Sequence, residues 1–211
     1  MGKIFFGLCA GAAIGAAVWY FFVRNNQVID RPRTGSAIVL FGDSLARGAG
    51  ASRGGDLATL LAARLGQEVL NEGQNGDTTA LALERLAEDV LERDPKIVII
   101  ILGGNDLLSG RPAEETGINL GEIIDRLHAR GAAVLLAGIR GGEGLADPYA
   151  AMYARVAAAK RTSFVPSILS GILGNPALMA DELHPNDNGY RVIANRLEPV
   201  LRQMAGERGT L

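Results

Sequence analysis

The chain has 211 residues, of which 48% are hydrophobic and 5% aromatic, and this size and composition fit one globular domain with its own core. A formal net charge of −2, with Lys and Arg scattered among acidic residues, excludes the basic surface that holds a phosphate backbone, so nucleic acid is not expected as a partner. The single cysteine, Cys9, excludes an internal disulfide, and one cysteine with two histidines leaves few ligands for zinc, so neither redox chemistry nor a metal site is expected.

An unbroken run of twenty uncharged residues, 4–23, lies near the start of the chain between Lys3 and Arg24. As a helix this run would be about 30 Å long, which is the thickness of the hydrocarbon core of a bilayer. The apolar region of a cleaved signal peptide is usually shorter, about 7 to 15 residues. We therefore expect residues 1–24 to form an uncleaved transmembrane anchor, with a cleaved signal segment and a secreted domain as the alternative.

The next residues, 25–36, are polar, contain Pro32 and Gly35, and are expected to form a tether. From residue 37 onward, short aliphatic runs alternate with helical patterns, which predicts a folded domain over 37–205 and a short tail over 206–211. The predicted strands are 37–41, 68–70, 96–102, 133–137 and 163–165. The predicted helices are 56–65, 78–93, 114–130, 147–160 and 186–204.

The predicted strands are mostly β-branched or aliphatic and continuous rather than alternating, as expected for a parallel sheet covered on both faces. Five strands that alternate with helices predict an α/β fold, a doubly wound three-layer α/β/α sandwich, and we expect the strand order 2-1-3-4-5. In such a sheet, functional residues gather at the carboxyl ends of the strands. Ser44, Gly76, Asn105 and His184 all follow predicted strands, and the segment 166–185 is long enough to carry His184 back to Ser44.

Two stretches near opposite ends of the chain, around Ser44 and His184, contain the residue types of a nucleophile and its base. A serine is a poor nucleophile until a base takes its proton, and a histidine base works best when a carboxylate fixes its tautomer and orientation. Asp181 precedes His184 by three residues. Taken singly, Ser44 could instead cap the next turn, Asn105 could be a turn residue, and Asp181 could cap the last helix.

Four short motifs follow the predicted strands in order, and together they resemble the four blocks of the SGNH (GDSL-type) hydrolases. The motifs are Gly42-Asp43-Ser44, Gly76-Asp77-Thr78, Gly103-Gly104-Asn105-Asp106 and Asp181-x-x-His184-Pro185. Within that superfamily the chain is most similar to the thioesterase I/lysophospholipase L1 and arylesterase group, over residues 37–201. The resemblance implies a flavodoxin-like fold and hydrolysis of esters or thioesters without a metal or an organic cofactor.

The resemblance also implies a role for each site residue by its position. Ser44 would be the nucleophile, His184 the base that takes its proton, and Asp181 the carboxylate that orients His184. The oxyanion would be bound by the backbone N–H groups of Ser44 and Gly76 and by the side-chain amide of Asn105.

Other polar residues close to these motifs are expected to serve structure rather than chemistry. Asp43 and Asp106 are expected to stabilise their loops, and Asp77 is most simply a helix N-cap. The second histidine, His128, falls within a predicted helix far from any strand end and is expected to be structural.

The loops that would surround the site are small and apolar, and their composition suits a medium or long acyl chain better than a sugar ester. The residues available to line such a groove are Leu107, Leu108, Leu145, Ile168, Leu169, Ile172, Leu173, Leu178 and Met179. We therefore expect a serine hydrolase that acts on small acyl esters, thioesters or lysolipids through an acyl-enzyme intermediate, held at a membrane by residues 4–23 with the catalytic domain outside the cytoplasm. A carbohydrate or cell-wall O-acetylesterase and a non-catalytic, membrane-tethered binding module are the alternatives.

Overall fold

The computed structural model describes residues 28–139 and 147–206, so the predicted membrane segment 4–23 lies outside the described residues. Its centre is a five-stranded parallel sheet in the order β2-β1-β3-β4-β5, which confirms the predicted sheet and strand order. The strands are β1 (Ala37–Gly42), β2 (Val69–Gly73), β3 (Pro95–Ile101), β4 (Ala133–Ala137) and β5 (Ser163–Val165).

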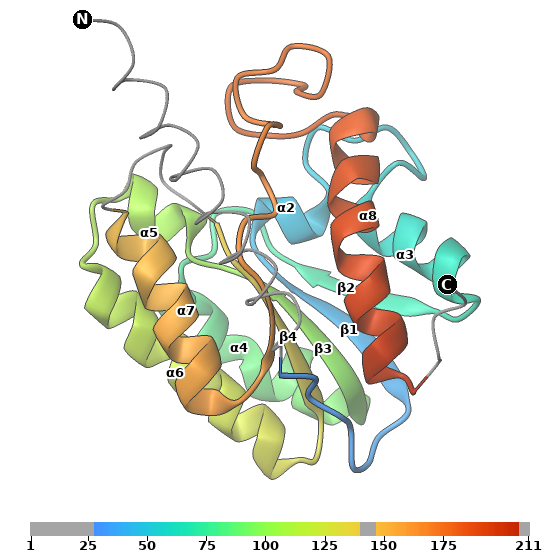
Figure 1. Ribbon diagram of the computed structural model, residues 1–211, viewed down its shortest axis with the longest axis vertical. Coiled ribbons are helices and arrows are strands. Elements are labelled where there is room, and N and C mark those ends of the chain that lie inside the picture. Colours follow the sequence, from blue (N-terminus) through green and yellow to red (C-terminus); the bar gives the residue numbers. More distant parts are fainter. Residues whose placement is uncertain (1–27, 140–146, 207–211) are drawn as a thin grey trace, which may run out of the picture.

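Helices cover both faces of the sheet, so the predicted three-layer α/β/α sandwich is confirmed (Figure 1). The helices of the described residues are α2 (Ser44–Arg47), α3 (Leu57–Leu65), α4 (Thr79–Asp89), the 3-10 turn η1 (Leu91–Arg93), α5 (Gly104–Leu108), α6 (Ala113–Ala129), α7 (Pro148–Lys160) and α8 (Asp187–Met204). α3 and α8 pack together on one face, and α4, α6 and α7 pack side by side on the other. Among the described residues, no helix is both long and apolar enough to span a membrane.

The aliphatic runs of the sequence form the core because they lie between the two helical layers. Residues 38–41 of β1, 97–101 of β3 and 133–137 of β4 are all buried. The register pairs Gly42 at the end of β1 with Gly73 of β2 on one side and Ile101 of β3 on the other. The loops that follow these three strands therefore leave the sheet at the same level, side by side.

Side-chain caps start α3, α4, α7 and α8, whereas α6 begins after Pro112 without one, and one predicted cap is wrong. The N-cap of α4 is Thr78, whose Oγ1 accepts the backbone N–H of Leu81 at 3.4 Å, rather than Asp77. Thr78 has the extended backbone conformation of an N-cap residue. The Asp77 carboxylate instead accepts a hydrogen bond from Arg85, with Nε 2.6 Å from Oδ2. The single helix predicted over 78–93 ends at Asp89 and is followed by η1.

Two short helices, α2 and α5, were not predicted. They contain four and five residues, too few to show a helical period in the sequence, and they follow β1 and β3 directly. Their importance is positional, because α2 begins at Ser44 and α5 contains Asn105.

The chain enters the domain at the amino ends of the strands, opposite to these short helices. The carboxylate of Asp30 accepts the backbone N–H of Val134 at 2.8 Å and contacts His128 Nε2 at 2.7 Å, while the Asp30 N–H donates to Ser163 Oγ. His128 therefore holds the incoming chain against β4 and β5, a structural contact far from the loops that carry the predicted site.

Candidate active site

The predicted site residues come together at the carboxyl ends of the strands. Ser44, Gly76, Asn105 and His184 all line one cleft of about 390 Å³. Asp181 lies behind His184, on the side away from Ser44. Residues up to 140 positions apart are thus neighbours, because three loops leave the sheet at one level and the segment after β5 returns over them.

Ser44 is the first residue of α2 and follows directly from β1. Asp43 is the N-cap of this helix, and its Oδ1 accepts the backbone N–H of Leu45 at 2.9 Å. As the first helical residue, Ser44 has no helical carbonyl to receive its own backbone N–H, which leaves that group for a ligand. The expectation that Asp43 stabilises this loop is confirmed.

A hydrogen-bonded chain links Ser44, His184 and Asp181. His184 Nε2 lies 3.0 Å from Ser44 Oγ, and His184 Nδ1 lies 2.9 Å from Asp181 Oδ2 and 3.1 Å from Oδ1. The alternative in which Asp181 caps the last helix is wrong, because Asn186 is the N-cap of α8. Hydrogen bonding to the His184 side chain, and then to the backbone N–H groups of Leu183 and His184, lowers the pKa of Asp181 to about 2.

The ionised carboxylate of Asp181 fixes which ring nitrogen of His184 carries the proton. A carboxylate only accepts hydrogen bonds, so His184 Nδ1 must donate to it. In the neutral ring Nε2 is then the acceptor, and it faces the Ser44 hydroxyl. The arrangement can take a proton from the serine.

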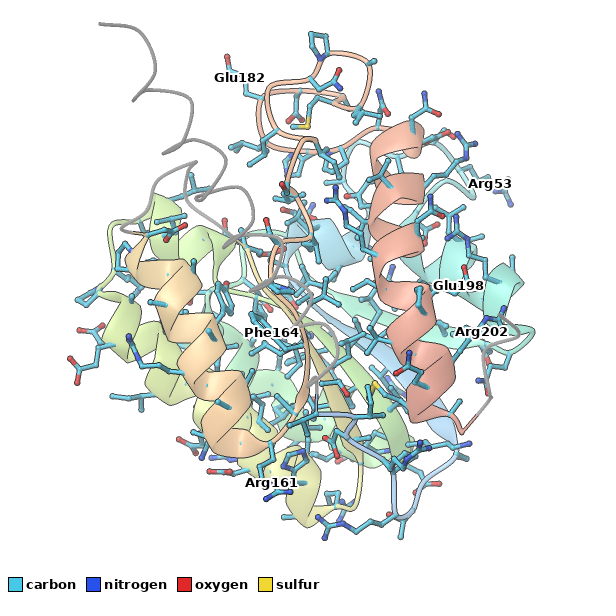
Figure 2. All side chains as sticks on the ribbon, viewed as in Figure 1. Arg53, Arg161, Phe164, Glu182, Glu198 and Arg202 are labelled. Atoms are coloured by element: carbon cyan, nitrogen blue, oxygen red, sulfur yellow. The ribbon has the colours of Figure 1, made fainter. Side chains whose placement is uncertain are left out.

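The loop that carries Asp181 and His184 is irregular, and side chains from α8 and its N-cap hold it in place. Asn186 Nδ2 donates to the carbonyls of Ala177 and Met179, and the Arg196 guanidinium donates to those of Ile168 and Ser170. Figure 2 shows Glu182, between the two site residues, at the outer end of this loop and pointing away from the domain.

Gly76 and Asn105 line the same cleft. Gly76 has a φ of +83°, a left-handed conformation that residues with a side chain rarely adopt. Asn105 Nδ2 donates one of its two N–H groups to the carbonyl of Asp77 at 2.8 Å, which fixes the amide and leaves the second N–H for a ligand. Asp106 is buried and accepts the N–H and the hydroxyl of Thr79, so it ties α5 to the start of α4 as expected of a loop-stabilising residue.

The electrostatics next to the serine are unusual because Asp43 is only 2% exposed. Burial raises the pKa of Asp43 to about 7, against the lowering effect of its hydrogen bond from the Leu45 N–H, and the charge of Asp77 raises it further. A carboxyl that is half protonated near neutral pH therefore stands beside the nucleophile. The sequence gives no sign of this, since burial depends on the packed loops.

Much of the wall of the cleft is apolar, as predicted. The residues that line it differ in part from those predicted. Of the nine residues predicted, Leu107, Leu108, Leu169 and Leu173 line the cleft, and Leu183 and Ile139 join them. Four others do not line it: Ile168 and Ile172 are fully buried in the core, and Leu178 and Met179 pack against the core half-buried. Leu145 lies outside the described residues. Within 28–139 and 147–206, no group of three His, Cys, Asp or Glu side chains could hold a metal ion.

Comparison with known proteins shows the family to which the chain belongs. Residues 40–192 match the model of the GDSL-like lipase/acylhydrolase family. The chain belongs to this family. It is an SGNH ester hydrolase of the esterase or thioesterase type, as the four motifs of the sequence imply.

Relatives with this fold are similar along most of their length. The esterase TesA of Pseudomonas aeruginosa is 33% identical over 79% of this chain and 88% of its own. The thioesterase 1/protease 1/lysophospholipase L1 of Escherichia coli K12 is 27% identical over 82% of this chain and 87% of its own. A crystal structure of TesA superposes with a TM-score of 0.75 at 31% identity and covers 80% of this chain and 99% of that one.

Proposed function

We propose that this SGNH hydrolase cleaves esters or thioesters of medium and long acyl chains, lysophospholipids among them, by a Ser44-His184-Asp181 triad. The observation that carries the proposal is the 3.0 Å contact of Ser44 Oγ with His184 Nε2, in a cleft whose wall includes six leucines. A cleft of about 390 Å³ is within the size range of sites for small organic molecules.

The proposed reaction has two steps that use the same groups. Ser44 Oγ attacks the acyl carbonyl carbon while His184 Nε2 takes the serine proton, and the proton then passes to the leaving oxygen or sulfur as its bond to carbon breaks. Water attacks the acyl-enzyme, His184 takes a proton from it, and Ser44 regains that proton as the carboxylic acid leaves. Asp181 stabilises the cationic ring in both steps.

The negative oxygen formed in each step would be bound by three donors. These are the backbone N–H groups of Ser44 and Gly76 and the second N–H of the Asn105 amide. All three residues line the cleft, and none of these donors changes charge with pH. The Asn105 amide is held in advance by the Asp77 carbonyl, so little reorganisation accompanies the reaction.

A panel of p-nitrophenyl esters from acetyl to octanoyl, with lysophospholipids, tests mechanism and substrate class together. Each methylene that enters the apolar cleft contributes about 0.8 kcal/mol, so kcat/KM should rise about fourfold per methylene until the cleft is full. Ser44→Ala should remove activity on every substrate. Activity on acetyl esters and acetylated glycan alone would favour the O-acetylesterase, and no activity on any ester would favour the binding module.

We also propose that residues 4–23 hold the enzyme at a membrane with the catalytic domain outside the cytoplasm. The support is the uncharged run of twenty residues between Lys3 and Arg24. Retention in membranes washed with alkaline carbonate, together with an intact N-terminus by mass spectrometry, is the expected result. A soluble protein that lacks the first residues would show instead that the segment is a cleaved signal.

A further inference from the structure

Arg85 of α4 makes four side-chain hydrogen bonds close to the site, although it does not line the cleft. Its side chain is only 15% exposed. Nε donates to Asp77 Oδ2 at 2.6 Å, Nη1 to Asp89 Oδ2 at 2.7 Å, and Nη2 to two backbone carbonyls. The guanidinium carbon also lies 4.6 Å from the centre of the Phe41 ring on β1.

The two carbonyls belong to neighbouring strands at their carboxyl ends. Arg85 Nη2 lies 3.1 Å from the oxygen of Gly42 on β1 and 3.0 Å from that of Glu72 on β2. Gly42 stands two residues before Ser44, and Glu72 stands four residues before Gly76. One guanidinium thus fixes the points at which two donor-bearing loops leave the sheet.

The third partner of Arg85 connects to the remaining donor. Asp77 follows Gly76 in the chain, and its carbonyl accepts the amide of Asn105 at 2.8 Å. The Asp77 side chain is only 3% exposed, and its carboxylate is paired with Arg85. Because Arg85 holds Asp77, it also influences where the adjacent Gly76 N–H and the Asn105 side chain lie.

We propose that Arg85 is a positioning residue of the oxyanion hole, which holds the Ser44, Gly76 and Asn105 donors at the spacing that the reacting oxygen requires. This inference rests on the proposed function of these donors. The planar guanidinium suits the task because its N–H groups diverge toward several acceptors at fixed angles, whereas a lysine presents one compact charge. Because Arg85 lines no part of the cleft, its loss should reduce stabilisation of the transition state more than it reduces binding of the substrate.

Arg85→Met and Arg85→Lys test the proposal by their separate effects on kcat and KM. A displacement of catalytic groups by about 1 Å lowers rates on the order of 100-fold, so we expect kcat to fall about 10- to 100-fold for Met and less for Lys, with KM changed less than about threefold. Kinetics are expressed per active serine, titrated to completion with a fluorophosphonate, so that misfolded protein does not count. If Arg85→Met fails to fold, Arg85→Lys supports the same comparison.

Arg64→Met is the matched control. Arg64 of α3 is a partly exposed arginine, hydrogen-bonded to Asn195 and Glu198 of α8, and it does not line the cleft. Its replacement should leave kcat and KM within about twofold of the wild type, because surface pairs of this kind contribute little. An equal loss of kcat in this control would overturn the assignment to Arg85.

A double-mutant cycle with Asn105→Ala separates positioning from general stability. If Arg85 acts through the donors, Arg85→Met should lower kcat by a factor at least three times smaller in the Asn105→Ala background than in the wild type. An equal factor in both backgrounds, a wild-type kcat in both Arg85 variants, or a rise in KM that matches the fall in kcat would overturn the proposal. Loss of all activity in Ser44→Ala alongside any of these results would leave the proposed function intact, whereas an active Ser44→Ala would contradict the proposed function itself.

Discussion

Replacing Asp43 by asparagine should stabilise the domain at alkaline pH and leave its stability almost unchanged in acid. The pKa of this buried carboxyl is raised from 3.8 to about 7 in the folded protein. Between these values the folded protein keeps the proton that the unfolded chain has released, so the free energy of unfolding falls as pH rises through this window. At about 1.36 kcal/mol per pKa unit, the fall is on the order of 4 kcal/mol and is complete above about pH 7.

Asparagine keeps the shape of Asp43 and the acceptor for the Leu45 N–H but has no charge to bury. Urea unfolding of both proteins from about pH 4 to about pH 8 should therefore give curves that separate as pH rises, with the variant more stable. Asp56→Asn is the matched control, because Asp56 caps α3 in the same way but is partly exposed. Wild-type and Asp43→Asn curves that stay parallel across this range would refute the reasoning.

Three further substitutions address the cleft directly. Asn105→Ala removes one proposed oxyanion donor and should lower kcat about 10²- to 10³-fold with little change in KM; an equal change in KM would show that the amide binds substrate instead. Gly50→Ala should lower kcat/KM at least about tenfold, because Gly50 has a φ of +86° and a Cβ there would lie 2.5 Å from the carbonyl oxygen of Pro185, which follows His184. Wild-type kinetics in a folded variant would contradict this placement. Leu173→Ser should lower kcat/KM several-fold on octanoyl esters but not on acetyl esters. Ile118 is an exposed residue of α6 away from the cleft, so Ile118→Ser should change kcat/KM on neither ester. Equal losses on both esters for Leu173→Ser would argue against an acyl groove.

The sheet and the positions of the motifs could be predicted because both depend on local patterns. β4 has the bounds that its aliphatic run predicts, since a strand buried on both faces needs an unbroken apolar sequence, and β5 also has the predicted bounds. The topology then brings Ser44 and Asn105 to one edge of the sheet, whatever the details of their loops. The sequence was sufficient to this point.

Features that depend on how irregular segments pack could not be predicted. The segment after β5 has no period, so nothing in the sequence distinguishes Ile168, which is buried in the core, from Leu183, which faces the cleft. The contacts of Arg85 escape prediction for another reason, because two of its acceptors are backbone carbonyls whose approach depends on strand register. The raised pKa of Asp43 likewise arises only once the surrounding loops exclude water.

The proposed serine mechanism predicts one covalent product that mass spectrometry can locate. A fluorophosphonate should add once per chain, at the Ser44 oxygen, with loss of fluoride and with loss of ester hydrolysis in proportion to labelling. Ser44→Ala should neither take up the label nor hydrolyse esters, and His184→Ala should react far more slowly than the wild type. Undiminished labelling or hydrolysis in Ser44→Ala would contradict the account at its centre.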